Sequence, residues 1–296
     1  MKAELAQIAQ AYEAASRYPS FSQPVFSKEA LEQFMPETPS AVSLPFPRED
    51  GRPGVRISLS LDRYQYFPAD TLLWKLDLQD PEGRKSWQAR LSVRALSGAV
   101  LIPEQAVADV VQGVLSLPEP QPGVTEYQLQ VRIESEGERY FISAPFRLNP
   151  AVARINGLSW AHQDGPWLNM ALSTDVFLPG YYFLSANLYN AMNGEPVVHL
   201  EAEQRLAAGS TTMTLKAHGS ALRARGDAGP YVLKDIRLIR GAEEGEPEDL
   251  AGQPPGAPVP VPGFALDTWD DTPWEDPEAA ERTEFLKKLA GFSQEP

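Results

Sequence analysis

The chain has 296 residues, 43% of them hydrophobic, which is enough for two domains that each bury a core. Its net charge is −14, and residues 241–296 hold 14 of the 40 acidic residues but only three basic ones. An acidic chain of this kind cannot neutralise a row of phosphates, which argues against a nucleic-acid partner. The sequence contains no cysteine, which excludes disulfides and cysteine nucleophiles.

The first predicted segment is an N-terminal helix followed by an extended arm, residues 1–54. Apolar residues recur at helical spacing in residues 1–16, which predicts a short amphipathic helix. Frequent prolines then keep residues 17–54 extended, so we expect an arm that lies against the body of the protein. The N-terminus lacks the apolar core of a signal peptide. The chain also contains no apolar run of about 18 residues, so the sequence predicts no membrane span. Two interpretations follow: either the protein is cytosolic, or an upstream anchor or signal sequence has been removed from it.

Residues 55–150 carry the alternating pattern of half-buried antiparallel strands. Turns rich in glycine and proline separate about seven such runs, which is typical of an immunoglobulin-like β-sandwich. The residues expected in its core include Val55, Ile57, Leu59, Trp74, Leu76, Leu91, Val93, Tyr127, Leu129, Val131, Ile142 and Phe146.

The same pattern restarts in residues 151–240, which predicts a second immunoglobulin-like β-sandwich. Its clearest strand places four alternate residues toward the core, namely Tyr182, Leu184, Ala186 and Leu188. The pair Asn193-Gly194 then predicts a hairpin turn. The two modules share an architecture, but no residue-level repeat supports a duplication.

The C-terminal part is predicted in two sections. Residues 241–263 combine prolines, glycines and acidic residues, which predicts a semi-extended linker. Residues 264–296 form an acidic, tryptophan-containing segment that ends in a helix, because Asp276, Pro277 and Glu278 together make a strong helix start.

No motif in the sequence indicates catalysis. The three histidines are scattered, and the G-x-S-x-G elbow, the phosphate-cradling glycine loop and the common calcium loop are all missing. Glu201 and Glu203 share a strand face, but neighbouring exposed glutamates are common and do not by themselves indicate a glycosidase. The sequence therefore predicts a protein that is not an enzyme, with no catalytic residue, no cofactor and no metal.

The first candidate binding surface is the outer side of the strand at 180–190. Tyr181, Phe183 and Tyr189 are expected to point away from the core, together with Ser185 and Asn187. Such a row could serve as a platform for a glycan or a peptide. The other interpretation is that it packs on the N-terminal arm or on the neighbouring module.

The second candidate is the acidic segment around Trp269, Asp270, Asp271 and Trp274. Tryptophans among acidic residues, after a proline-rich linker, are typical of a peptide that docks on a protein partner. Alternatively, the tail folds back and buries both tryptophans on the second sandwich.

Part of the second module resembles a known group of proteins. GYYFLSANLYNAMNGEPVVHLEAEQRLAAG at 180–209 and GDAGPYVLKDIRLI at 226–239 resemble strands of uncharacterised bacterial cell-envelope proteins with tandem immunoglobulin-like domains. RYPSFSQP at 17–24 is similar to the stretch that follows their membrane anchor or signal sequence. The resemblance implies a periplasmic or otherwise extracytoplasmic protein, membrane-anchored in its full-length form, with a structural or binding role and no catalytic residues.

We therefore expect an all-β chain of two tandem immunoglobulin-like β-sandwiches with an extended N-terminal arm and a C-terminal helix. Its predicted function is that of a non-enzymatic envelope scaffold or adaptor. It would bind another protein through its sandwich surface and its acidic C-terminal segment. The alternative is a carbohydrate-binding module that uses the exposed aromatic strand face, with a glycan as partner.

Overall fold

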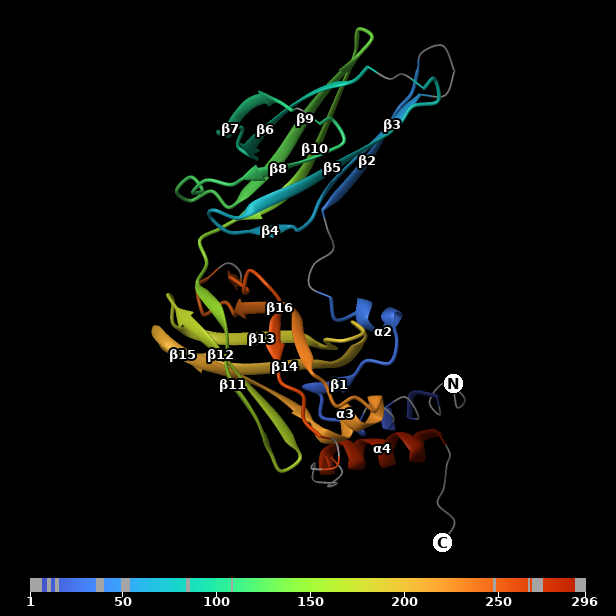
Figure 1. Cartoon of the computed structure of the whole chain (residues 1–296), viewed down its shortest axis with the longest axis vertical. Helices are drawn as coiled ribbons and strands as arrows, with labels where there is room; N and C mark the ends of the chain where they lie inside the picture. The colour runs from blue at the N-terminus through green and yellow to red at the C-terminus, as the bar shows by residue number, and fades with distance from the viewer. Residues whose placement is uncertain are drawn as a thin grey trace. The chain divides into compact units, whose positions relative to one another are not determined.

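The chain divides into two units, each with its own buried core (Figure 1). Glu37–Pro150 form one unit, here called the first sandwich, and Met1–Pro36 join Ala151–Pro296 in the other, the second sandwich. The computed structural model describes residues 7–9, 12–13, 16–35, 40–48, 54–83, 86–107, 109–246, 249–265, 267 and 274–290. The prediction of two immunoglobulin-like β-sandwiches and a C-terminal helix is confirmed.

The first sandwich consists of two sheets whose inward side chains form one core. One sheet has the strand order β2-β3-β5-β8, with β2 (Ala41–Phe46), β3 (Val55–Leu61), β5 (Thr71–Gln79) and β8 (Gln112–Ser116). The other has the order β4-β10-β9-β6-β7, with β4 (Gln65–Tyr66), β6 (Gln88–Ala95), β7 (Val100–Ala106), β9 (Glu126–Ser135) and β10 (Glu138–Leu148). Alternate residues of β3 and β9 are buried, as the period of two predicts.

The predicted start of the first sandwich at residue 55 is wrong, because β2 belongs to it. Strand β2 pairs antiparallel with β3 at the edge of its sheet. It contains Pro45, and a proline is tolerated on an edge strand whose outer side needs no N–H donor. The prolines that suggest an arm are therefore compatible with an edge strand.

The second sandwich also has two sheets (Figure 1). The larger has the order β1-β14-β13-β16-β17, with β18 also paired to β16, and consists of β1 (Ser22–Pro24), β13 (Gly180–Asn190), β14 (Pro196–Leu206), β16 (Tyr231–Arg240), β17 (Leu250–Gly252) and β18 (Val259–Val261). The smaller has the order β11-β12-β15, with β11 (Ala153–Asp164), β12 (Trp167–Val176) and β15 (Gly209–His218).

Two segments predicted to lie outside the modules supply strands to this sheet. From the predicted arm, β1 pairs antiparallel with β14. From the predicted linker 241–263, β17 and β18 both pair with β16, and Val259 and Val261 are buried in the core. These short strands bury apolar side chains at the sheet edge, so the interpretation of 241–263 as a linker outside the fold is wrong.

Within the described residues, the helices with defined bounds are α2 (Lys28–Glu32), α3 (Gly219–Arg225) and α4 (Pro277–Ala290). Helix α4 begins where the sequence predicts, and the Asp276 carboxylate accepts a hydrogen bond from the Ala279 N–H at 3.0 Å. The Lys287 ammonium of α4 lies 2.8 Å from the Glu13 carboxylate near the N-terminus. Among the described helices, none is long and apolar enough to span a membrane.

Candidate functional site

The accessible part of the first candidate surface lies at the start of β13. The four residues predicted to face the core are buried, namely Tyr182, Leu184, Ala186 and Leu188. On the opposite side, Tyr181 is 37% exposed and Phe183 is 45% exposed. Their rings meet edge to face, with centroids 5.2 Å apart and planes at 72°. Partial desolvation and a hydrogen bond to Glu203 both raise the pKa of Tyr181.

The far end of that face is covered, so the expectation that Tyr189 is exposed is wrong. The register between β13 and β16 shifts between Ser185 and Asn187, and nearby Asp235 has a positive φ of 52°. The Asp235 carboxylate accepts hydrogen bonds from the Asn187 amide at 3.0 Å and from the Tyr189 hydroxyl. Burial and this carboxylate raise the pKa of Tyr189. Tyr189 is therefore part of a buried polar network.

His199 of β14 extends this network and is covered by the N-terminal segment. The Phe34 ring stacks on the imidazole at 4.0 Å, and the Phe34 carbonyl accepts a hydrogen bond from the Asn187 amide nitrogen. Because that nitrogen donates, the Asn187 side-chain oxygen accepts from His199 Nδ1–H at 2.7 Å. His199 Nε2 then faces Glu201 at 3.3 Å. Burial lowers the pKa of His199, against the opposing effect of Glu201.

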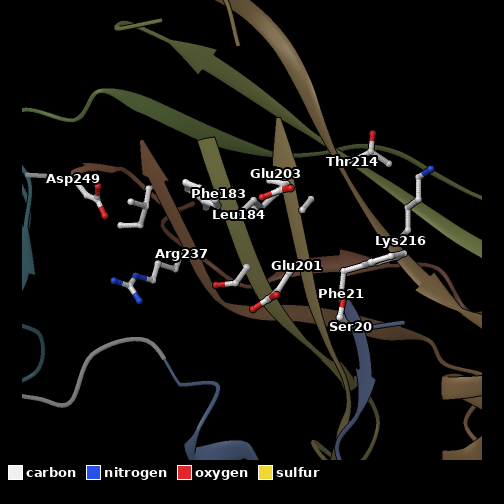
Figure 2. Close-up of a pocket in the computed structure, with 13 residues that line it drawn as sticks. Ser20, Phe21, Phe183, Leu184, Glu201, Glu203, Thr214, Lys216, Arg237 and Asp249 are labelled. Carbon is white, nitrogen blue, oxygen red and sulfur yellow. The ribbon is translucent and has the colours of Figure 1, made fainter. Parts of the chain in front are cut away.

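An open groove of about 700 Å³ lies beside Phe183 (Figure 2). Its lining comes from β13 to β16, from the residues before β1 and from the residue before β17: Ser20, Phe21, Phe183, Leu184, Ser185, Glu201, Ala202, Glu203, Thr214, Lys216, Arg237, Ile239 and Asp249. Figure 2 shows Glu201 and Glu203 between Arg237 on one side and Lys216 on the other. Neither of these two cations forms an ion pair with another described residue. The groove therefore offers both signs of charge next to apolar rings.

The groove adjoins an open edge of strand β14. Strand β1 pairs only with Val198–Leu200, and the Glu201 N–H donates to the Phe21 carbonyl at 3.0 Å just beyond it. Backbone groups alternate sides along a strand, so the N–H and C=O groups of Glu203 and Arg205 point to the same side as those of Glu201. No strand in the described part of the chain pairs with them there. Such an edge can accept another extended chain.

Trp274 of the acidic segment packs against the second sandwich. Its ring lies 6.0 Å from Trp167 and 6.1 Å from both Phe21 and His218, edge to face in each case. Phe21 and Trp167 in turn stack with centroids 5.8 Å apart. For Trp274 the structure agrees with the fold-back interpretation, and Phe21 belongs both to this aromatic cluster and to the groove.

The other predicted residues of the acidic segment, Trp269, Asp270 and Asp271, lie outside the described residues. The chain is anchored on both sides of them. Before them, the Phe264 N–H donates to the Ala228 carbonyl at 2.9 Å. After them, Trp274 contacts Phe21, Trp167 and His218. The described residues on both sides of Trp269, Asp270 and Asp271 therefore contact the second sandwich.

The groove also contains residues that the sequence analysis does not select, above all Phe21, Lys216 and Arg237. Alternation along β15 and β16 indicates that Lys216 and Arg237 point outward. It does not indicate that these strands flank the same groove as Glu203. Within the described ranges, no group of three or more acidic or histidine side chains is placed to hold a metal ion.

Comparisons with known proteins give a distant likeness. No family model matches this chain, and no curated protein matches it. Among solved structures it is similar to a DUF4785 family protein from Legionella pneumophila, with 17% identity and a TM-score of 0.43 over 63% of this chain and 52% of that one. The match thus spans about half of the Legionella protein.

Two further similar structures are more distant still. The FN1–FN3 domains of chicken CNTN1 match with 10% identity and a TM-score of 0.28, over 72% of this chain and 76% of that one. A candidate carbohydrate-binding protein from Bacteroides uniformis matches with 10% identity and a TM-score of 0.24, over 59% and 87%.

Proposed function

We propose that this chain is a non-catalytic binding protein that holds an extended segment of a protein partner along the open edge of β14. The observation that carries the proposal is the unpaired backbone of Glu203 and Arg205 beside the groove. A segment added there as a strand would gain main-chain hydrogen bonds from the edge. Its side chains would be selected by the groove.

The side chains of the groove suit a polypeptide better than a neutral sugar. Phe183 offers an exposed apolar contact, while Glu203 and Arg237 offer charges of opposite sign. A peptide with an apolar, a basic and an acidic side chain can complement Phe183, Glu203 and Arg237 at once. Such complementarity makes the groove selective among peptide sequences. Tyr181 and Phe183 meet edge to face, so they do not form the flat surface on which a sugar ring stacks.

Selection from a phage-displayed library of random peptides, followed by fluorescence polarisation with the selected peptides, tests this function. We expect Phe183→Ala and Arg237→Glu each to weaken binding about tenfold or more, because each removes a central contact of the groove. The matched control is Phe141→Ala on β10 of the first sandwich, since Phe141 and Phe183 are both 45% exposed. If Phe183→Ala and Arg237→Glu bind the selected peptides with the same affinity as the wild type and the Phe141→Ala control, the groove is not the binding site.

We further propose that the partner lies in the cell envelope and that the acidic segment with Trp269, Asp270 and Asp271 makes a second contact with it. The support is the resemblance of residues 180–209 and 226–239 to envelope proteins, together with the exposed charge expected of that segment. Fractionation of the native host with an antibody to this chain tests the location. Recovery in the cytosol alone would contradict an envelope role.

A further inference from the structure

A second strand edge faces the groove from the other sheet of the second sandwich. Strand β15 lies at the end of the β11-β12-β15 sheet. The His218 N–H at the end of β15 points away from β12, because it donates to the Ser22 hydroxyl at 2.9 Å. Backbone groups alternate sides along a strand, so the N–H and C=O groups of Thr214 and Lys216 point to the same open side. In the described part of the chain, no strand pairs with them there.

Strand β1 enters the gap between these two edges but fills only one end of it. It pairs with Val198–Leu200 of β14, and its Ser22 hydroxyl accepts the hydrogen bond from β15. The chain turns away just before β1, where the Ser22 N–H donates to the Pro19 carbonyl at 2.9 Å. Past this turn, Glu203 of β14 and Lys216 of β15 both line the groove (Figure 2). The groove is therefore the part of the gap that no described strand fills.

The gap also leaves core-facing positions of β14 uncovered. Even-numbered residues of β14 point to the core, and Val198, Leu200 and Leu206 among them are buried. Ala202 is only half-buried and Gln204 is exposed, although both have the same parity. Ala202 packs against the core and also lines the groove. An apolar side chain that enters the gap would therefore cover apolar surface that water now contacts.

We infer, on the basis of the proposed function, that the bound partner segment is an amphipathic strand that inserts between β14 and β15 and hydrogen bonds to both. The segment runs antiparallel to β14, as β1 does in the same gap. Its apolar side chains, at every second position, point inward toward Ala202. The intervening side chains are polar or charged and point outward, between Glu203 and Lys216.

An extended chain is the occupant that fits the gap, because the gap continues the place of β1. Strand β1 already has partners on both β14 and β15. A segment held by β14 alone would form main-chain hydrogen bonds on one side only, and would leave the backbone of Thr214 and Lys216 unpaired. A strand between the two edges pairs on both sides. Each strand residue advances about 3.3 Å, so the edge from Glu201 to Arg205 accommodates about five residues of the partner.

Fluorescence polarisation of the library-selected peptides with Thr214→Pro tests the insertion on the full chain. Proline removes the Thr214 N–H that points into the gap and leaves the hydrogen bonds between β15 and β12 intact, so we expect a folded variant. Its peptide affinity is expected to fall about tenfold or more. Thr214→Ala keeps the N–H, so its loss of affinity is expected to be smaller than that of Thr214→Pro.

The matched control is Val114→Pro on β8, an edge strand of the first sandwich. The Val111 carbonyl accepts from the Leu76 N–H of β5, so by alternation the Val114 N–H points to the open side of β8. This variant places a proline at an equivalent edge position and is expected to leave the peptide affinity unchanged. A loss of affinity as large as that of Thr214→Pro would overturn the insertion.

Two results distinguish the insertion from the proposed function. If Glu203→Pro weakens peptide binding and a folded Thr214→Pro does not, the segment adds to β14 alone; the insertion is overturned and the proposed function stands. If neither variant changes the affinity, both are overturned. Hydrogen–deuterium exchange of the wild-type chain is the second measurement in case Thr214→Pro does not fold. The amides of Thr214 and Lys216 are expected to exchange more slowly with peptide bound, and unchanged exchange there would contradict the insertion.

The sequences of the selected peptides test the amphipathic character of the strand. We expect apolar residues at every second position, and we expect asparagine at one of these positions to weaken binding about tenfold or more. Selected peptides without this alternation would overturn the amphipathic strand.

Sedimentation velocity tests the other occupant, a second copy of this chain. A monomeric wild-type chain supports the assignment to a different protein. Self-association that both Glu203→Pro and Thr214→Pro abolish would overturn it.

Discussion

Replacing Asn187 by alanine is expected to lower the free energy of unfolding of the second sandwich by roughly 2–4 kcal/mol. Asn187 is only 1% exposed and connects His199, Asp235 and the Phe34 carbonyl through hydrogen bonds. Alanine would leave the His199 Nδ1–H and one acceptor position of the Asp235 carboxylate without a partner in a water-poor setting. Urea unfolding followed by circular dichroism and tryptophan fluorescence measures the loss.

A matched control is Asn156→Ala on β11. Asn156 also hydrogen bonds to a carboxylate, that of Asp175 at 2.9 Å, but it does so at the surface. Its removal is expected to cost less than about 1 kcal/mol. A loss for Asn187→Ala no larger than this would mean that the buried network does not stabilise the sandwich.

Replacing Glu203 by proline is expected to weaken binding of the selected peptides about tenfold or more, with the sandwich still folded. The Glu203 N–H points to the open edge of β14 and not to β13, so proline removes a donor that only an added strand would use. Proline also hinders a second chain from approaching the edge closely. Fluorescence polarisation with the library-selected peptides measures the change in affinity.

Two controls separate the backbone effect from other effects. Glu203→Ala removes the same side chain but keeps the N–H, so its peptide affinity is expected to lie closer to that of the wild type. Gln204→Pro changes the next residue, whose N–H points to β13, and is expected to destabilise the sheet. A folded Glu203→Pro variant with wild-type affinity would exclude strand addition at this edge.

The inner faces of both sandwiches could be predicted because side chains alternate strictly along a regular strand. Tyr182 and Leu184 are buried as this period requires. The cover over the outer face could not be predicted in this way. Alternation along β13 holds through Leu188, which is in the core, but Asp235 beside the register shift with β16 hydrogen bonds to Tyr189 and covers it. The bulge that turns Trp160 outward depends in the same way on the pairing of β11 with β12. Neither shift has a clear local sequence signal, because each depends on the neighbouring strand.

The edge strands and the groove depend on contacts between distant segments. The proline-rich stretches that contain β1, β2, β17 and β18 look like an arm and a linker, yet each pairs at or near a sheet edge. Composition predicts their extended conformation but not their partners. The groove likewise joins Phe21, Glu203 and Lys216 from separate strands, and alternation alone does not reveal that these strands adjoin.

Hydrogen–deuterium exchange of the full chain, with and without a saturating library-selected peptide, tests strand addition most directly. The amides of Glu203 and Arg205 are predicted to exchange more slowly when the peptide is bound, because each would become hydrogen bonded to it. Amides of β11, which belongs to the other sheet, are predicted to remain unchanged. Unchanged exchange in the β14 segment, or protection confined to another strand edge, would contradict the proposed binding site.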